Sequence, residues 1–362
     1  MRLLWAKLRD FRNHQQTRVD DVPEGVITVV GANGEGKTNL LEGIGFLFSL
    51  ASHRVSANLP LVREGATAGY ARGEIQTGGG RFLVEVEVPV AGASRLQVNR
   101  SPVRRKRDLR KQVRAVFFGP DDLDVVRGDP SQRRRFMHEA AVSLWPLKES
   151  TLTAYDRTLR QRNRLLKDWE GRGQPPDLEA WDSELIEKGC ALMRLREEAV
   201  GRLAPSAEAE FLHLADYGLG CEYRPSVAGA SEEEFRQRLA DRRADELIRR
   251  TSLVGPHRDD LGLAVKDLGA RNFASHGEAW AAALCLRLGL AAAVEKEIAE
   301  RPVLLLDDPF SALDPTRQQK VAERLADGGQ VLLSVADEAH VPARADATWD
   351  VAAGRVSVRE GR

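Results

Sequence analysis

The sequence GANGEGKTN occupies residues 31–39 and directly follows the apolar run VITVV. It matches the pattern G-x-x-x-x-G-K-S/T at every fixed position, between a predicted strand and a predicted helix. Glycines let successive backbone N–H groups point inward, and the helix that follows adds the positive end of its dipole. A glycine-rich turn with a surface lysine is the alternative, but the strand and helix favour a phosphate-binding loop. The predicted ATP-binding residues are Gly31, Ala32, Asn33, Gly34, Glu35, Gly36, Lys37, Thr38 and Asn39.

A second motif, PVLLLDDPFSALD, occupies residues 302–314. An apolar run that ends in two carboxylates is typical of a buried strand whose tip enters a site. We expect Asp307 to hold Mg²⁺ with Thr38, and Asp308 to orient or deprotonate the attacking water. Either aspartate alone could be a solvated turn residue, but the pair beside a phosphate-binding loop favours catalysis. Lys37, Asp307 and Asp308 are therefore the predicted catalytic residues.

A third motif, SHGEAW, occupies residues 275–280 and precedes a long apolar helix. Ser275 and Glu278 have the S-x-x-E spacing of a capping box, which alone would make them structural. The same geometry, with Gly277 allowing close approach, also makes an anion site at a helix start. The motif lies shortly before the Asp307 strand, at the place of the signature motif in ATP-binding-cassette ATPases. We therefore expect Ser275, Gly277 and Glu278 to contact the γ-phosphate of ATP bound to a second subunit.

Composition limits the class of protein. The 362 residues include 54 Lys+Arg and 54 Asp+Glu, so the net charge is zero, which excludes a global attraction to nucleic acid but not a local basic patch. The three cysteines fit neither a zinc site nor a disulfide framework. MRLLWAKLRD lacks the apolar core of a signal peptide, and the longest apolar candidate, residues 280–294, is interrupted by Arg287. We expect a cytoplasmic protein that does not enter a membrane.

The pattern along the chain predicts an α/β core interrupted by a mainly helical insert. Apolar runs and alternating segments predict strands in the first part, and charged amphipathic segments predict an antiparallel helical unit or short coiled coil in the middle. SEEEFRQRLADRRADELIRR, residues 231–250, reads as one further helix. The predicted divisions are an ATPase lobe at 1–125, a helical insert at 126–252 and a return of the ATPase core at 253–362.

The order of the three motifs resembles that of cassette ATPases, although 270 positions separate Lys37 from Asp307. Transporter ATPases are much tighter, and chromosome-structuring or Rad50-type proteins have hundreds of heptad residues between their halves. The chain instead resembles the RecF family. The segments that carry this resemblance are LRDFRNH (8–14), SHR (52–54), PDDLDVVRGDPSQRRRFMH (120–138), VGPHRDDL (254–261) and LLLDDPFSALD (304–314).

The sequence departs from the family pattern at three places and from the pattern of the wider cassette group at a fourth. His138 stands where RecF proteins often have Asp or Asn, and Ala312 gives SALD instead of the usual S-E-L-D. Ser334 or Val335 lies near the place of a switch histidine, and Asp308 replaces the glutamate of the wider cassette group. A shorter second carboxylate fits slow hydrolysis.

The resemblance implies a P-loop ABC-type ATPase head, Rad50-like, with an inserted mainly helical lobe. It also implies ATP-dependent dimerisation on DNA near single-strand gaps, with RecR and RecO as partners in loading RecA. DNA repair, replication restart and the SOS response follow from that role. ATP and Mg²⁺ are the implied cofactors.

Two basic runs are candidates for DNA contact. RSPVRRKRDLRKQVR, residues 100–114, has eight basic residues and one acidic, and DRTLRQRNRLLK, residues 156–167, has five and one. A solvated helix face is the alternative for each. Because residues 100–114 contain no aromatic side chain, contact with duplex phosphates is favoured over base stacking. The predicted DNA-binding residues are Arg104, Arg105, Lys106, Arg107, Arg110 and Lys111.

Arg54 follows the predicted P-loop helix. Related ATPase heads place an arginine there that faces the nucleotide or DNA, whereas a surface arginine near a helix C-terminus is the alternative.

Two other functions remain open from the sequence. One is the ATPase subunit of a transporter, which the long insert and the missing switch histidine disfavour. The other is a DNA clamp that binds ATP without hydrolysing it, and a substitution at Asp308 would separate this from a slow ATPase.

Overall fold

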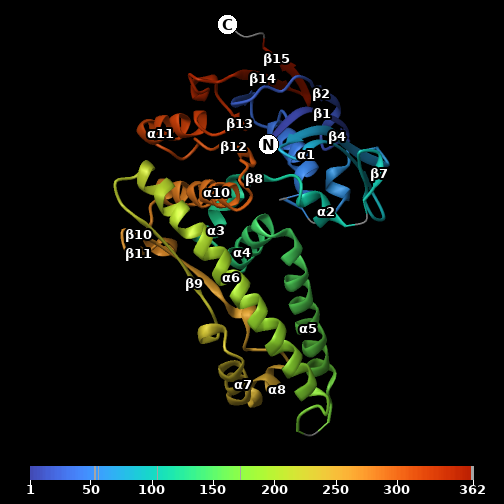
Figure 1. Cartoon of the computed structure of the whole chain (residues 1–362), viewed down its shortest axis with the longest axis vertical. Coiled ribbons are helices and arrows are strands. Elements are labelled where there is room, and N and C mark those ends of the chain that lie inside the picture. The colour runs from blue at the N-terminus through green and yellow to red at the C-terminus, as the bar shows by residue number, and fades with distance from the viewer. Residues whose placement is uncertain (53, 56, 104, 172, 360–362) are drawn as a thin grey trace.

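The computed structural model describes residues 1–359 except residues 53, 56, 104 and 172. Sheets and helices form an upper lobe, and a group of helices extends below it (Figure 1). In the described chain the central sheet has six strands in the order β15-β14-β3-β13-β12-β8, parallel except for β15. Its strands are β3 (Val26–Val30), β8 (Ala115–Phe118), β12 (Val303–Asp307), β13 (Val331–Val335), β14 (Ala347–Ala352) and β15 (Arg355–Val358). Three of them, β3, β12 and β13, are buried along their whole length, as expected for strands covered on both faces.

A second sheet, antiparallel, covers one side of the first. In the described residues it has the order β2-β1-β4-β5-β6-β7. Its strands are β1 (Arg2–Phe11), β2 (His14–Val19), β4 (Ala68–Thr77), β5 (Gly80–Pro89), β6 (Arg95–Val98) and β7 (Ser101–Pro102). Helix α1 (Lys37–Ser49) packs between the two sheets, and its apolar residues join both in one buried cluster. The helix that starts at the P-loop is thereby fixed to both sheets.

Helices cover the other face of the central sheet. The largely apolar α10 (His276–Ile298) packs there with α4 (Pro130–Leu144) and the second half of α6 (Leu178–Leu214). Among the described residues, α10 alone has the length and apolarity to cross a membrane, and 78% of its most apolar window is buried. That burial is typical of a core helix. Shorter elements complete this side of the lobe, namely α3 (Leu123–Arg127), α9 (Ala270–Phe273), α11 (Pro315–Ala326), β9 (Leu219–Arg224), β10 (Asp260–Val265) and β11 (Leu268–Gly269). Helix α2 (Lys106–Arg110) lies on the side of α1 instead.

The lower lobe is helical. Helix α5 (Glu149–Asp168) packs against the first half of α6, and α7 (Glu232–Asp241) and α8 (Arg243–Arg249) close the group. The single helix predicted over residues 231–250 is wrong, because the helix ends at Asp241 and a new one starts at Arg243. The bend brings the buried Glu246 to the α5–α6 pair. Since α6 contributes to both lobes, the divisions predicted at residues 125 and 252 stay predictions.

Candidate nucleotide-binding site

The loop between β3 and α1 has the backbone expected of a phosphate-binding loop. Gly34 and Gly36 have φ of +88° and +115°, which glycine adopts at little cost. A Cβ at Gly36 would lie 2.6 Å from the Asn13 side chain, so a larger residue does not fit there. Lys37 Nζ donates hydrogen bonds to Gly31 O at 2.6 Å and Ala32 O at 3.0 Å. Burial lowers the pKa of Lys37, and the charges of Asp307 and Asp308 oppose that shift.

Thr38 and Asp307 meet at the carboxyl edge of the central sheet. The Thr38 hydroxyl donates to both carboxylate oxygens of Asp307, at 2.9 and 2.8 Å. Ser334, at the end of the adjacent β13, donates to Asp307 Oδ1 at 2.6 Å and accepts from the Asp308 N–H at 3.1 Å. A hydroxyl and one carboxylate are a donor set that suits Mg²⁺, which usually takes its other ligands from substrate phosphates and water. The residues present therefore fit the implied ion.

Asp308 has the geometry of a functional residue. Its φ of +52° is unusual outside glycine and indicates local backbone strain at the strand tip. The carboxyl group is half-buried, and this burial raises its pKa, as does the charge of the adjacent Asp307. A carboxylate with a raised pKa is a better proton acceptor near neutral pH.

Sequence reasoning gave Ser334 and His340 no role in the site. Ser334 stands near the place of a switch histidine and instead fixes Asp307 by a hydrogen bond. His340, in the turn Glu338–His340, acts through its charge to lower the pKa of Asp308, together with Lys37. The only sequence signal for His340 is a histidine six positions after Ser334.

The SHGEAW motif forms the capping box that its spacing predicts. Ser275 caps α10 by accepting from the Glu278 N–H at 3.2 Å, and Glu278 accepts from the Ser275 N–H at 2.8 Å. Glu278 also accepts from Lys266 Nζ and Tyr217 Oη; these three bonds, led by that from Lys266, lower its pKa to about 2. The Glu278 carboxylate is therefore already bonded within its own chain. Ser275 is exposed, and no contact in the described structure joins it to residues 31–39.

The helix start also contacts the loop that follows β12. A Cβ at Gly277 would lie 3.1 Å from Ala312 O, so this position favours glycine. Trp280 Nε1 donates to Pro309 O at 2.9 Å. The candidate signature motif and the loop after the two aspartates therefore form one surface.

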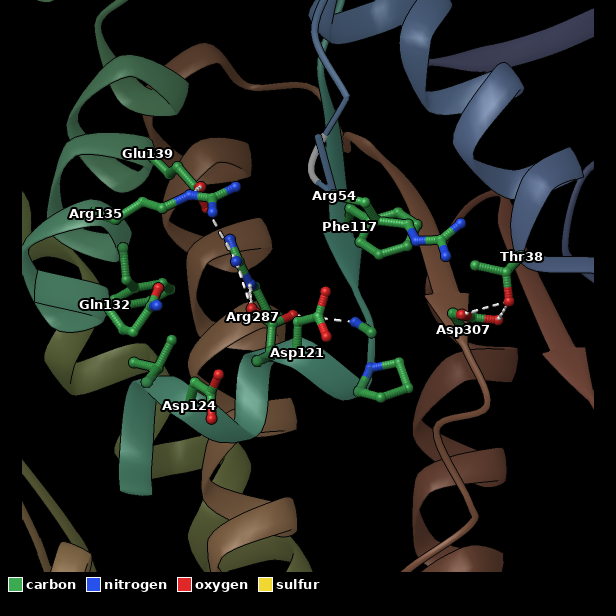
Figure 2. A pocket seen from close by; sticks show the side chains of 15 residues that line it. Thr38, Arg54, Phe117, Asp121, Asp124, Gln132, Arg135, Glu139, Arg287 and Asp307 are labelled. Atoms are coloured by element: carbon green, nitrogen blue, oxygen red, sulfur yellow. Dashed lines mark hydrogen bonds and ion pairs between the residues drawn. The ribbon is translucent and has the colours of Figure 1, made fainter. Parts of the chain in front are cut away.

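A cavity of about 420 Å³ opens beside the Thr38–Asp307 pair (Figure 2). Arg54 lies at its edge and donates to Asn39 Oδ1 at 3.0 Å, which places it beside the P-loop helix. Arg287, from the middle of α10, donates to Asp122 at 2.5 Å and to Glu139 at 3.0 Å on the opposite wall. The sequence indicated Arg287 only as an interruption of an apolar helix.

The predicted DNA-binding segment lies away from this cavity, and two of its basic side chains already make hydrogen bonds within the protein. Lys106 Nζ donates to Leu50 O at 2.7 Å, and Arg110 donates to Ser49 O at 2.8 Å and to Glu149 at 3.0 Å. These two side chains therefore hold the C-terminal end of α1. Arg105 and Lys111 are exposed and Arg107 is half-exposed, whereas Arg104 lies outside the described residues.

Comparison with known proteins assigns the family. The family described as RecF/RecN/SMC N terminal domain matches residues 4–356. The DNA replication and repair protein RecF of Frankia alni is 42% identical over 98% of this chain and 99% of its own, and that of Cutibacterium acnes is 39% identical over 98% of each. The chain belongs to the RecF family of DNA replication and repair proteins.

The solved structures agree with that assignment. The structure of the recombination mediator protein RecF-ATPrS in the RecFOR pathway is similar to this chain, with a TM-score of 0.89, 27% identity, and coverage of 99% of this chain and 98% of that one. The Smc head domain of Pyrococcus furiosus shares the fold, with a TM-score of 0.58 and 16% identity over 99% of this chain and 95% of that one. The predicted family and the predicted ATPase-head fold with a helical lobe are confirmed, and the family is one of ATPases.

Proposed function

We propose that the chain is an ATP-dependent DNA-binding recombination mediator that works as a dimerisation switch. In this proposal residues 31–39 bind the triphosphate, with Lys37 at the β- and γ-phosphates. Thr38 and Asp307 hold Mg²⁺, which neutralises phosphate charge. The hydrogen bond from Ser334 keeps Asp307 in place for that contact.

Hydrolysis in this scheme depends on Asp308. Its half-buried carboxylate, with a pKa raised by burial, accepts the proton of the attacking water. The charges of Lys37 and His340 oppose that shift and favour the ionised form that accepts the proton. The reaction is slow and acts as a timer, because one short carboxylate supports it.

The observation that carries the dimer is the exposed start of α10. Ser275 caps this helix but contacts no described residue of its own P-loop, so its anion-binding end is free for another chain. ATP favours the dimer because Ser275 and Gly277 of a second copy add contacts that only the dimer has. Glu278 orients the cap and does not itself meet the phosphate, since its carboxylate is already bonded.

The biological role follows from the family. The dimer would form on duplex DNA near single-strand gaps in the cytoplasm and act with RecR and RecO to help RecA replace single-strand-binding protein. This role connects the switch to DNA repair, replication restart and the SOS response. Arg54 would face the bound nucleotide across the cavity.

Sedimentation velocity with ATP, with ADP and without nucleotide tests the proposal. Wild type is expected to dimerise only with ATP, and Ser275→Arg is expected to stay monomeric because the arginine blocks the helix start. Ser231→Arg is the matched control, because the Ser231 hydroxyl also accepts from the third N–H of its helix, α7, far from any proposed phosphate. An ATP-bound Ser275→Arg dimer would contradict the proposal.

A further inference from the structure

Helix α5 divides its five basic residues between two roles. Arg162 is completely buried and is bonded to Asp182, Glu246 and Ser252. The other four, Arg157, Arg160, Arg164 and Lys167, are exposed. The run that looked uniform in sequence therefore contains one structural arginine and a set of solvent-facing cations.

The exposed cations form a single stripe. Their spacings of three, four and three residues place them on one face of a helix with 3.6 residues per turn. Arg164 pairs with Asp168 at 3.4 Å, and none of the other three has an ion pair in the described structure. Like charges three and four residues apart destabilise a helix, so this stripe opposes the stability of α5. An anionic ligand would relieve that repulsion.

The neighbouring helices have the opposite charge balance. Helix α6 has eight carboxylates and four basic residues, and α7 has four and two, whereas α5 has five basic residues and three carboxylates. Helix α8 (Arg243–Arg249) has two of each, so among the described helices of the lower lobe α5 alone has an excess of basic residues. This asymmetry gives α5 a local electrostatic attraction that the net charge conceals.

The stripe has neighbours at both ends. At the N-terminal end of α5, Glu149 accepts from Arg110 of α2, the helix that Arg105 and Lys111 flank. At the other end, the exposed Arg250 donates to Lys167 O at 3.3 Å. Figure 1 shows α5 along the outer side of the lower lobe, with α2 above its start. The four stripe residues span about 15 Å, over which one strand of duplex presents about four phosphates.

We propose that the exposed face of α5, with Arg157, Arg160, Arg164 and Lys167, is the main contact of this chain with the phosphate backbone of duplex nucleic acid. The contact is independent of base sequence in this proposal, because the cations of the stripe meet phosphates, which carry no sequence information. Arg162 keeps α5 rigidly placed, so the stripe is presented without an ordering step. This inference rests on the DNA-binding part of the proposed function and moves its centre from residues 104–111, where Lys106 and Arg110 already hold α1.

The test is the salt dependence of duplex binding, measured by fluorescence anisotropy on the full chain with ATP and Mg²⁺. The variant is R157Q/R160Q/K167Q, whose residues have no ion pair in the described structure and whose replacements favour helix. The control is R194Q/R202Q/R236Q, which removes three equally exposed arginines without ion pairs from the described faces of α6 and α7. Both variants change the net charge by the same amount.

Loss of three phosphate contacts should reduce the slope of log K against log salt by about 2 to 3 and weaken binding roughly tenfold or more. The control should keep the wild-type slope, and both variants should still dimerise with ATP. A stripe variant with the wild-type slope overturns the inference, as does a control that loses the same slope. If wild type dimerises with ATP but binds no duplex at low salt, the DNA-binding part of the proposed function is wrong. If that protein instead binds polyglutamate, the stripe is a protein-docking surface, and the inference fails as well.

Discussion

Two polar clusters in this molecule contain similar residues and have different purposes. At the carboxyl edge of the central sheet, Thr38, Asp307 and Asp308 face an open cavity. In the lower lobe, Arg162 is completely buried among Asp182, Glu246 and Ser252. Both clusters join segments that are far apart in sequence.

The two clusters differ in whether their polar groups can still bind a ligand. Each nitrogen of the Arg162 guanidinium donates to a protein acceptor and the side chain is completely buried, so it presents no exposed group to a ligand. Asp307 receives two hydroxyl groups and still faces the cavity, and Asp308 occupies a strained backbone conformation next to it. Buried charge with complete pairing indicates structure, whereas charge at an open edge indicates chemistry.

The largest effect expected from this comparison is on the free energy of unfolding, when the buried Arg162 cluster is disrupted. Arg162→Ala takes a completely buried cationic partner from Asp182 and Glu246 and leaves them Arg243 as the remaining cation, which should lower the free energy of unfolding by about 3–5 kcal/mol. Arg194→Ala, an exposed arginine of α6, should change it by less than about 0.5 kcal/mol. Urea unfolding measures both. A loss below about 1 kcal/mol for Arg162→Ala would show that the lobe does not depend on this cluster.

The next effect is on catalysis. Asp308→Asn should lower the rate of ATP hydrolysis about 100-fold while ATP-dependent dimerisation persists, because proton transfer and not binding is removed. Since the pKa of Asp308 is raised, wild-type activity should fall with decreasing pH at a value above the ordinary range of an aspartate, and the variant should lack this acid limb. Asp314→Asn, at the cap of α11, is the control. Equal single-turnover rates for wild type and Asp308→Asn would remove Asp308 from the reaction.

The smallest effect concerns pH and the junction of the lobes. Arg196 donates to His138 Nε2, so that nitrogen must be unprotonated. Burial, followed by the charge of Arg196, lowers the pKa of His138 to about 3. As the pH falls, His138 is therefore protonated in the unfolded chain before it is protonated in the folded one. The stability that this difference gives above about pH 6.5 is lost as the pH falls below that value.

His138→Gln keeps an acceptor for Arg196 and does not titrate. Between pH 6.5 and pH 5 it should lose less stability than wild type, by on the order of 1 kcal/mol. His213→Gln, at an exposed position of α6, should behave like wild type. Parallel stability curves for wild type and His138→Gln would contradict the assignment.

The sequence predicts the local geometry of the candidate nucleotide site well, because each motif is local. The P-loop, the two aspartates and the capping box are short patterns whose residue types follow from the backbone they need. The alternation of sheet and helix also predicts the ATPase head. The choice between capping box and anion site at Ser275 could not be made from sequence, since both use the same hydrogen bonds.

The remaining features depend on contacts across the fold. Arg162 and Glu246 are 84 residues apart, and the exposed and buried arginines of α5 have the same local sequence pattern. Lys106 and Arg110 read as a free basic run until α2 is placed against the end of α1. Likewise, Arg287 acquires its role only when α10 packs beside Asp122 and Glu139.

The most direct test of the two-sided ATP site is complementation between two inactive variants. Lys37→Ala lacks a working P-loop, and Ser275→Arg lacks a working helix start, so each alone should neither dimerise with ATP nor hydrolyse it. In a mixed dimer the intact P-loop of one chain faces the intact helix start of the other, and activity should return to at most about half of wild type in this symmetric arrangement. A mixture as inactive as its components would show that each chain encloses its own nucleotide and would contradict the account.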